Sequence, residues 1–290
     1  MNYYNVDNEK IVRSCYLKLL SREPDKDALD YFVNLLNSNS INENEIKNQI
    51  KNSFEYQLSH PIEIESNTPV DIKMKKEWEA RTKLQLRFWK EHFPNDLDFW
   101  NSGTEISKKI LGITEQRFSK ITQNNEPKNM KILEIGCGIG RILIPMSKIF
   151  GEVIGIDVSS EMVKIGNTQI KNISNCTIFE NNGTDLSLFS DNFFNFCYSY
   201  VVFQHIPEKE IIEKYVEEVY RVLKPGSLFR FQVRGNVDTK PKEITTWDGV
   251  QFTSKEIHNI AKKNNFEILE EGNDIDEYYW LTFKSKKVNF

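Results

Sequence analysis

The stretch KILEIGCGIGR, residues 131–141, runs from an apolar β-type segment directly into a loop that carries Gly136, Gly138 and Gly140. Glycine lets a backbone bend sharply and approach a ligand that a Cβ atom would exclude. A helical pattern follows Arg141. This order of strand, glycine turn and helix predicts a ligand-binding loop in an α/β domain.

Strand-like and helix-like segments alternate on the C-terminal side of this loop. After Pro127, short β-rich runs alternate with helical patterns, which is typical of a parallel sheet with crossover helices. The predicted strands read KILEI, VIGID, CTIFE, FNFCYSYVV and LFRFQV. The last two runs, FEILE and YYWLTFK, are joined by a turn-like segment at residues 271–274 and predict an antiparallel pair at a sheet edge.

The residues before this domain are helical in pattern. In residues 1–62, an apolar stripe that includes Ile11, Cys15 and Leu19 predicts the first of three helices, with Ser40 as the cap of the third. Residues 63–125 start with a polar linker and continue as a helical cover, with Gly103 as a possible break. We therefore expect three regions, at residues 1–62, 63–125 and 126–290.

Composition limits the function classes. The 290 residues carry a formal net charge of −4, which makes nucleic-acid binding unlikely because such proteins usually show a basic excess. No apolar run approaches the roughly 20 residues of a membrane span. The 4 cysteines are far apart and predict neither a metal site nor a redox pair. Together with an N-terminus that does not look like a signal peptide, these features lead us to expect a cytoplasmic protein.

The residues around the glycines discriminate between two ligand classes. A dinucleotide fingerprint starting at Gly136 would require glycine or alanine at position 141, where this chain has arginine. The acidic Glu134 in the pattern E-x-G-x-G-x-G instead resembles the donor-binding loop of class I S-adenosylmethionine-dependent methyltransferases. That resemblance extends over about residues 127–284 and implies a Rossmann-like, mostly parallel seven-stranded sheet with an antiparallel terminal strand.

The resemblance, with the strand that ends at Asp157, assigns the methyl-donor site. A carboxylate about 20 residues after the glycines is the usual acceptor of both ribose hydroxyls, although Asp157 could alternatively serve only the cap of the next helix. Asn182 stands where the family usually has an aspartate that holds the adenine, with Asp185 as its rival. The expected donor-binding residues are Glu134, Gly136, Cys137, Gly138, Gly140, Arg141, Asp157, Val158, Met162, Asn182, Gly183, Thr184, Ser199 and Tyr200.

The segment FNFCYSYVVFQHIP, residues 194–207, resembles the fourth strand of small-molecule methyltransferases and the turn after it. His205 in this segment has a suitable ordinary pKa for taking a proton from an acceptor hydroxyl, although it could instead only anchor the following helix. The expected acceptor-binding residues are Trp100, Gln204, His205, Arg234 and Trp280.

The acceptor class follows only from resemblance. Residues 1–62 resemble a small helical domain of uncharacterised function that recurs in bacterial surface and glycan-related proteins, which suggests a glycan or small-molecule acceptor and a possible protein partner. We therefore expect methyl transfer from S-adenosylmethionine to an oxygen, or a nitrogen, without a metal ion. The alternatives are a catalytically inactive donor-binding scaffold and a nicotinamide oxidoreductase.

Overall fold

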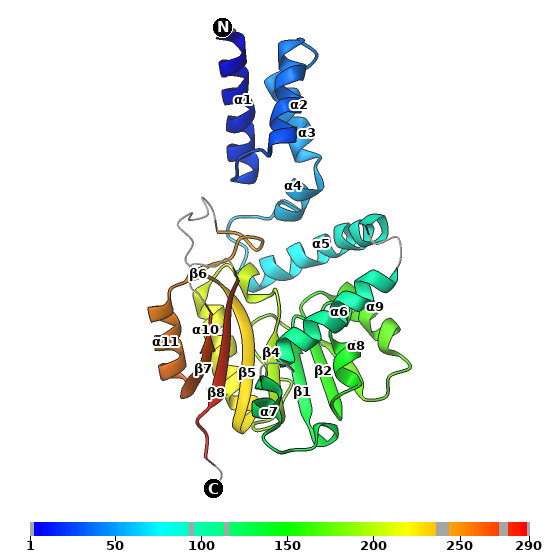
Figure 1. Ribbon diagram of the computed structural model, residues 1–290, viewed down its shortest axis with the longest axis vertical. Coiled ribbons are helices and arrows are strands. Elements are labelled where there is room, and N and C mark those ends of the chain that lie inside the picture. Colours follow the sequence, from blue (N-terminus) through cyan, green and yellow to red (C-terminus); the bar gives the residue numbers. More distant parts are fainter. Residues whose placement is uncertain (1–2, 93–95, 113–115, 236–243, 273–277, 289–290) are drawn as a thin grey trace. The chain divides into compact units, whose positions relative to one another are not determined.

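The structure is a computed structural model that describes residues 3–92, 96–112, 116–235, 244–272 and 278–288. The chain divides into two compact units. One is formed by Met1–Glu63, and the other contains Ile64–Lys240 and Ile244–Phe290 (Figure 1). Each unit has its own hydrophobic core and is described by itself.

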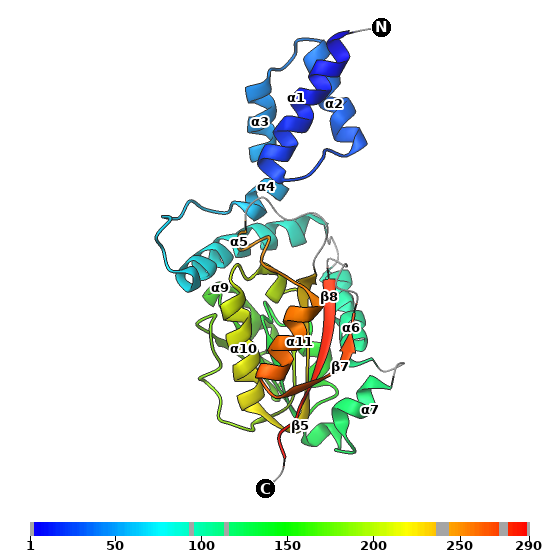
Figure 2. The ribbon, with the colours of Figure 1, turned by 90° about the vertical axis from the view of Figure 1, so that its left-hand side faces the viewer.

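The first unit is a small helical bundle (Figure 2). Its helices are α1 (Tyr3–Leu20), α2 (Lys26–Asn37), α3 (Glu43–Lys51) and α4 (Phe54–Ser59). The predicted stripe is its core, where Cys15 and Tyr16 are buried with Phe32 and Ile46. The cap predicted for the third helix is wrong, because Asn42 rather than Ser40 forms a capping box there with Glu45.

The second unit begins with the helices α5 (Val70–His92), α6 (Asp96–Leu111) and α7 (Arg117–Thr122). The break expected at Gly103 is absent, since α6 continues through it. A Cβ atom at Gly103 would lie 2.2 Å from the carbonyl oxygen of Arg141. Glycine therefore allows α6 to pack closely against the glycine loop, and it does not end the helix.

The second unit is built on an eight-stranded sheet, with seven strands in the order β3-β2-β1-β4-β5-β8-β7 and the short β6 paired with β5. Strands β1 to β5 pair in parallel and β8 is antiparallel to both of its neighbours, which confirms the expected fold class. The strands are β1 (Lys131–Ile135), β2 (Glu152–Asp157), β3 (Cys176–Glu180), β4 (Phe194–Ser199), β5 (Leu223–Gly235), β6 (Gln251–Phe252), β7 (Phe266–Glu271) and β8 (Tyr278–Ser285).

Helices cover both faces of this sheet (Figures 1 and 2). Alternate side chains of β1 enter different clusters, because successive residues of a strand point to opposite faces. Leu133 lies with residues of α10 and α11, whereas Ile132 lies with residues of α6, α7 and α8. The remaining helices are α8 (Leu143–Ser147), α9 (Ser160–Ile170), α10 (Lys209–Val222) and α11 (Ser254–Lys263), with 3-10 turns at Pro127–Asn129 and Phe203–His205.

Candidate functional site

A cavity of about 400 Å³ lies at the carboxyl ends of β1, β2, β3 and β4. Four neighbouring parallel strands end at this edge, and the loops that follow them form the floor. Residues of α5 and α6 complete the walls. In α/β sheets this is the usual position of a ligand site, and the volume falls in the ordinary range for small-molecule pockets, about 300–1,000 Å³.

The glycine loop forms one wall. Gly136 and Gly138 have φ values of +74° and +54°, a region that side chains rarely adopt. A Cβ atom at Gly136 would lie 2.3 Å from the Val202 side chain, whereas one at Gly138 would meet no atom within 4 Å. The loop therefore presents bare backbone to open space at Gly138.

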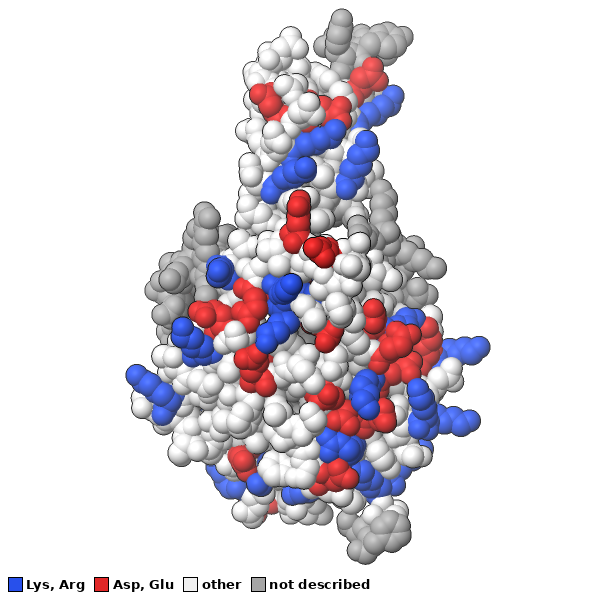
Figure 3. Space-filling model, turned by 180° about the vertical axis from the view of Figure 1, so that it is seen from behind, with Lys and Arg blue, Asp and Glu red and all other residues white. Residues whose placement is uncertain are grey.

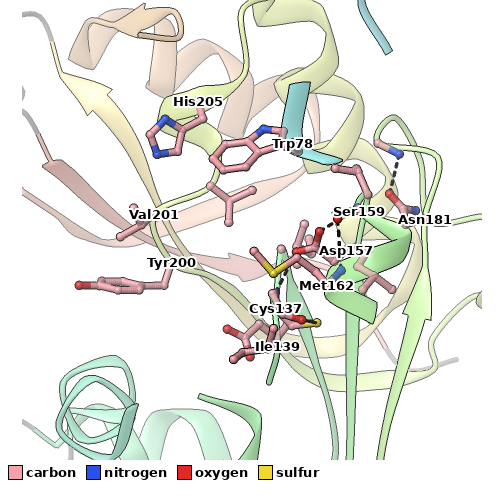
Figure 4. Close-up of a pocket in the computed structure, with 18 of the residues that line it drawn as sticks. Trp78, Cys137, Ile139, Asp157, Ser159, Met162, Asn181, Tyr200, Val201 and His205 are labelled. Atoms are coloured by element: carbon pink, nitrogen blue, oxygen red, sulfur yellow. Dashed lines mark hydrogen bonds between the residues drawn. The ribbon is translucent and has the colours of Figure 1, made fainter. Parts of the chain in front are cut away.

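Asp157, the last residue of β2, holds this loop in place. One carboxylate oxygen accepts a hydrogen bond from the Gly138 N–H at 2.8 Å, and the other accepts one from the Ser159 N–H at 2.9 Å. Burial raises the pKa of the Asp157 carboxyl, while hydrogen bonds from Ser159 and Gly138 oppose the rise. Ser159 itself caps α9 through its hydroxyl. Asp157 thus lies at the cavity wall with one hydrogen bond to each carboxylate oxygen (Figure 4).

Glu134 is a second buried carboxyl at the cavity. The Tyr198 hydroxyl donates to it at 3.0 Å, and burial raises the pKa of Glu134 to about 8. Arg141 lines the same cavity, lies with its guanidinium 5.4 Å from the centre of the Phe99 ring and donates to the Ser102 hydroxyl. Burial disfavours the charged form of Glu134, while the Tyr198 hydrogen bond and the nearby Arg141 guanidinium oppose that effect.

At the end of β3 the structure brings Asn181 and Gly183, and not Asn182 or Thr184, to the cavity. The Asn182 side-chain oxygen, Oδ1, accepts from the Thr184 and Asp185 N–H groups and so closes a local turn. Asn181 is missed by the sequence reasoning. The parallel pairing of Asp157 with Glu180 is the signal that places the next residue, Asn181, at the same level as the cavity.

The other predicted residues divide into two groups. Those that line the cavity are Glu134, Gly136, Cys137, Gly138, Arg141, Asp157, Val158, Met162, Gly183, Tyr200 and His205. Gly140 packs near Ile178, and Ser199 is buried with its hydroxyl donating to the Ile135 carbonyl. Trp100 packs beside Phe99, and Trp280 stacks on Tyr200 with ring centres 5.8 Å apart. Gln204 and Arg234 line a second cavity beyond His205.

His205 lies at the wall of the first cavity, where the Trp78 ring packs against it with 5.3 Å between ring centres (Figure 4). The Trp247 ring also packs against it, with 5.1 Å between ring centres. Its Nδ1 is 2.7 Å from the Trp247 carbonyl oxygen. Because a carbonyl only accepts, Nδ1 carries the proton and Nε2 carries the lone pair. Burial lowers the pKa of His205 to about 4. The imidazole is therefore neutral near pH 7, with Nε2 able to accept a proton.

Helix α5 contributes residues that the sequence reasoning did not assign to the site. Met74 and Trp78 line the cavity. One turn further, the fully buried Arg81 pairs with Glu77, donates to the Thr246 hydroxyl and lies 4.9 Å from the Trp78 ring centre. These contacts connect α5 to the segment that carries Trp247.

Among the described residues, no group of three or more His, Cys, Asp or Glu side chains is arranged to hold a metal ion. None of the helices described is long and apolar enough to span a bilayer. On the face seen in Figure 3, acidic and basic side chains are interspersed over the second unit.

Comparison with known proteins identifies two regions. Residues 132–226 match the family described as "Methyltransferase domain", and residues 2–59 match a "Domain of unknown function (DUF4214)". Demethylmenaquinone methyltransferase of Staphylococcus carnosus is 38% identical over 104 residues, which are 35% of this chain and 42% of that protein. Sterol 4-C-methyltransferase of Caenorhabditis elegans is 29% identical over 105 residues, 35% of this chain and 30% of that protein. The chain thus spans less than half the length of each of these relatives, 42% and 30%.

Solved structures with a similar arrangement include a SAM-dependent methyltransferase from Methanosarcina mazei. It has 22% sequence identity, a TM-score of 0.45, and coverage of 57% of this chain and 96% of that chain. A SAM-dependent methyltransferase from Aquifex aeolicus has 18% identity, a TM-score of 0.44, and coverage of 61% and 97%.

Proposed function

We propose that this chain, which carries a class I S-adenosylmethionine-dependent methyltransferase domain, transfers a methyl group to an oxygen, or a nitrogen, of a small molecule or glycan. The observation that carries the proposal is the cavity at the strand ends, where the Gly138 backbone, the Asp157 carboxylate and the His205 imidazole face one space. The relatives' names leave the acceptor open, because one of them is a carbon methyltransferase.

The residues of the first cavity fit the donor. Asp157 supplies carboxylate oxygens for the ribose hydroxyls, and the apolar side chains of Val158 and Met162 line the wall expected for the adenine. Glu134 and Asp157 are buried carboxyls that a sulfonium cation would complement, and Trp78 and Tyr200 offer aromatic rings to the same cation. When bound, S-adenosylmethionine supplies a methyl group already activated on sulfur.

The chain's own contribution is then to position the acceptor and take its proton. Holding two reactants in the correct geometry removes a large entropic part of the barrier. His205 Nε2 accepts the proton of the attacking hydroxyl, while the Nδ1 contact with the Trp247 carbonyl fixes the ring and its tautomer. His205 is therefore our candidate general base.

The proposal also includes a cytoplasmic location and a protein partner for the first unit. Four free cysteines, all buried, support a reducing compartment such as the cytoplasm. The protein partner that we expect for residues 1–62 stays a prediction.

The test is incubation of the purified chain with methyl-labelled donor and fractionated cell extract. We expect label in a glycan or small-molecule fraction, attached to oxygen or nitrogen. Label attached to carbon would contradict the proposed acceptor atom. Tight donor binding without label in any fraction would support the inactive scaffold instead.

A further inference from the structure

Helix α5 buries a complete ion pair beside the site. The Arg81 side chain has none of its surface exposed, and Glu77, one turn earlier, is 7% exposed. Arg81 donates to the Glu77 carboxylate at 3.3 Å, yet it lines neither of the two cavities. Taking a charged side chain out of water is costly, so a buried arginine that touches no ligand calls for a local explanation.

The Arg81 guanidinium contacts three side chains besides Glu77. It donates to the Thr246 hydroxyl at 2.8 Å, and that hydroxyl donates to the Glu77 carboxylate. It also lies 4.9 Å from the centre of the Trp78 ring and 5.7 Å from the centre of the Trp247 ring. Arginine suits this position because its planar group carries several donors and is also attracted to aromatic rings. Arg81 thus joins α5 to the segment that carries Trp247.

The same two aromatic rings flank the candidate general base. Trp78 and Trp247 pack against the His205 imidazole with 5.3 and 5.1 Å between ring centres. Figure 4 shows Trp78 beside His205. The Trp247 carbonyl oxygen accepts from His205 Nδ1 at 2.7 Å, which sets the tautomer of the imidazole. Both rings that flank His205 therefore also contact Arg81.

Trp247 lies between two anchors in the chain. On its C-terminal side, the Gly249 N–H donates at 3.0 Å to a carbonyl of the 3-10 turn at Phe203–His205. On its N-terminal side, the Thr246 hydroxyl accepts from Arg81. The Trp247 carbonyl is thus held from both sides, and Arg81 provides the anchor to α5.

Arg81 also places a positive charge near His205. Burial lowers the pKa of Arg81 to about 10, so the guanidinium stays protonated near pH 7. Burial is the main cause of the low pKa of His205, and the hydrogen bond to Trp247 opposes it. Among the nearby charges, Arg81 and Arg234 lower this pKa and Asp248 raises it. The charge of Arg81 therefore helps to keep the imidazole neutral.

We propose that Arg81 is a positioning residue, which aligns Trp247 so that its carbonyl oxygen holds the His205 imidazole with Nδ1 protonated and Nε2 able to accept a proton. The proposal rests on the proposed function, in which His205 takes the proton of the acceptor hydroxyl. Arg81 acts through Trp78, Thr246 and Trp247 and touches no reactant. Its removal should therefore alter the imidazole while the donor-binding residues of β1 and β2 keep their places.

The test reads the tautomer and the pKa of His205 by NMR, on the full chain containing isotope-labelled histidine. The chain has 4 histidines, and the signals of His205 are those that disappear in His205→Ala. In the unchanged chain we expect the proton on Nδ1 and a ring that stays neutral down to about pH 5.

The decisive variant is Arg81→Met, which keeps most of the side-chain length but removes the charge and the donors. We expect a mixture of the two neutral tautomers, because Trp247 loses its anchor. The pKa of His205 should rise from about 4 toward its ordinary value of 6.5, because a nearby positive charge is lost. Arg81→Lys keeps the charge without the planar donors, so the tautomer should change while the pKa stays low.

A second variant, Thr246→Val, removes the hydroxyl that Arg81 holds and leaves the arginine in place. It should also mix the tautomers. The matched control is Arg117→Met, because Arg117 is 6% exposed, pairs with Glu270 and lines neither cavity. The control should leave the His205 signals unchanged.

Three results would overturn the positioning role: a proton on Nε2 in the unchanged chain, an unchanged tautomer in folded Arg81→Met or Thr246→Val protein, or an equal change in Arg117→Met. Where Arg81→Met does not fold, Thr246→Val decides alone. Calorimetry with S-adenosylhomocysteine, the demethylated donor, on the unchanged chain keeps the two claims apart. Absence of binding would contradict the proposed function, whereas binding together with an unchanged His205 in the variants would contradict only the role of Arg81.

Discussion

The two cavities that meet at His205 differ in how the chain builds them. The donor cavity is formed largely by the consecutive ends of β1, β2, β3 and β4, each within a few residues of a recognisable strand. The second cavity combines Gln204, Arg234, Asp248 and Tyr278, which come from four separate parts of the chain. The first cavity has a sequence motif because most of its residues lie within a few positions of a strand end. The second cavity has no motif, because only the fold brings its residues together.

The largest expected effect concerns His205, one of three residues that line both cavities. His205→Ala should lower turnover about 10²- to 10⁴-fold while leaving donor affinity nearly unchanged, because the proton acceptor is lost. Since the ring also packs against Trp78 and Trp247, turnover is compared per folded molecule. The matched control is His258→Ala, since His258 is exposed and pairs with Glu271 far from the site in sequence. Equal turnover in the two variants would remove His205 from the mechanism.

The dependence of turnover on pH tests the same role of His205. Burial lowers the pKa of His205 to about 4, so turnover should stay level between about pH 5.5 and 8 and fall only as the pH approaches 4. Folding stability from the neutral ring should be fully present above about pH 6.5 and lost as the pH falls toward 4. An ionisation near 6.5 in the profile, lost in His205→Ala, would show that the ring is less buried than described.

The dependence of the unfolding free energy on pH tests the burial of Glu134 in the first cavity. The pKa of Glu134 is raised by burial from 4.5 to about 8, so its neutral form favours folding. Its contribution is present below pH 4.5 and disappears as the pH rises to about 8, at about 1.4 kcal/mol per pKa unit, or a few kcal/mol in all. Glu134→Gln should therefore flatten the dependence of the unfolding free energy on pH in this range. Glu267→Gln, at an exposed position of β7, should not.

The next largest effect is expected on the affinity for the donor. Asp157→Ala should weaken S-adenosylhomocysteine binding by roughly 1.5–3 kcal/mol, the usual worth of hydrogen bonds to a charged group. Asp98→Asn, at an exposed position of α6, is the control. Unchanged affinity in a folded Asp157→Ala protein would place the ribose site elsewhere.

The smallest effect is expected from removing the first unit. A chain that starts at Ile64 keeps α5 and should bind S-adenosylhomocysteine with nearly full affinity, because every residue lining either cavity lies after that point. A second chain that starts at Asp96 lacks Met74 and Trp78 and should bind more weakly. Loss of binding in a folded Ile64 chain would show that the first unit helps to build the site.

The sequence alone predicts the features that depend on residues close together in the chain. The glycine loop, the carboxylate at the end of β2 and the antiparallel β8 follow from short patterns with a fixed physical meaning. The sequence alone does not predict features that depend on packing between residues far apart in the chain. Gly103 looks like a helix break, yet it is the point where α6 approaches the Arg141 carbonyl. Asn182 stays a prediction as the adenine ligand, and the residue of this turn that lines the cavity is Asn181. Trp247 and Asp248 belong to no motif, and only the folded chain brings them to His205.

The central claim is that the cavity at the strand ends is built for S-adenosylmethionine. Isothermal titration calorimetry with S-adenosylhomocysteine and with NADH, on the same full-length sample, tests it most directly. We predict a micromolar dissociation constant for S-adenosylhomocysteine, about −8 kcal/mol, and much weaker binding of NADH. Tighter binding of NADH than of S-adenosylhomocysteine would contradict the account and favour a nicotinamide oxidoreductase.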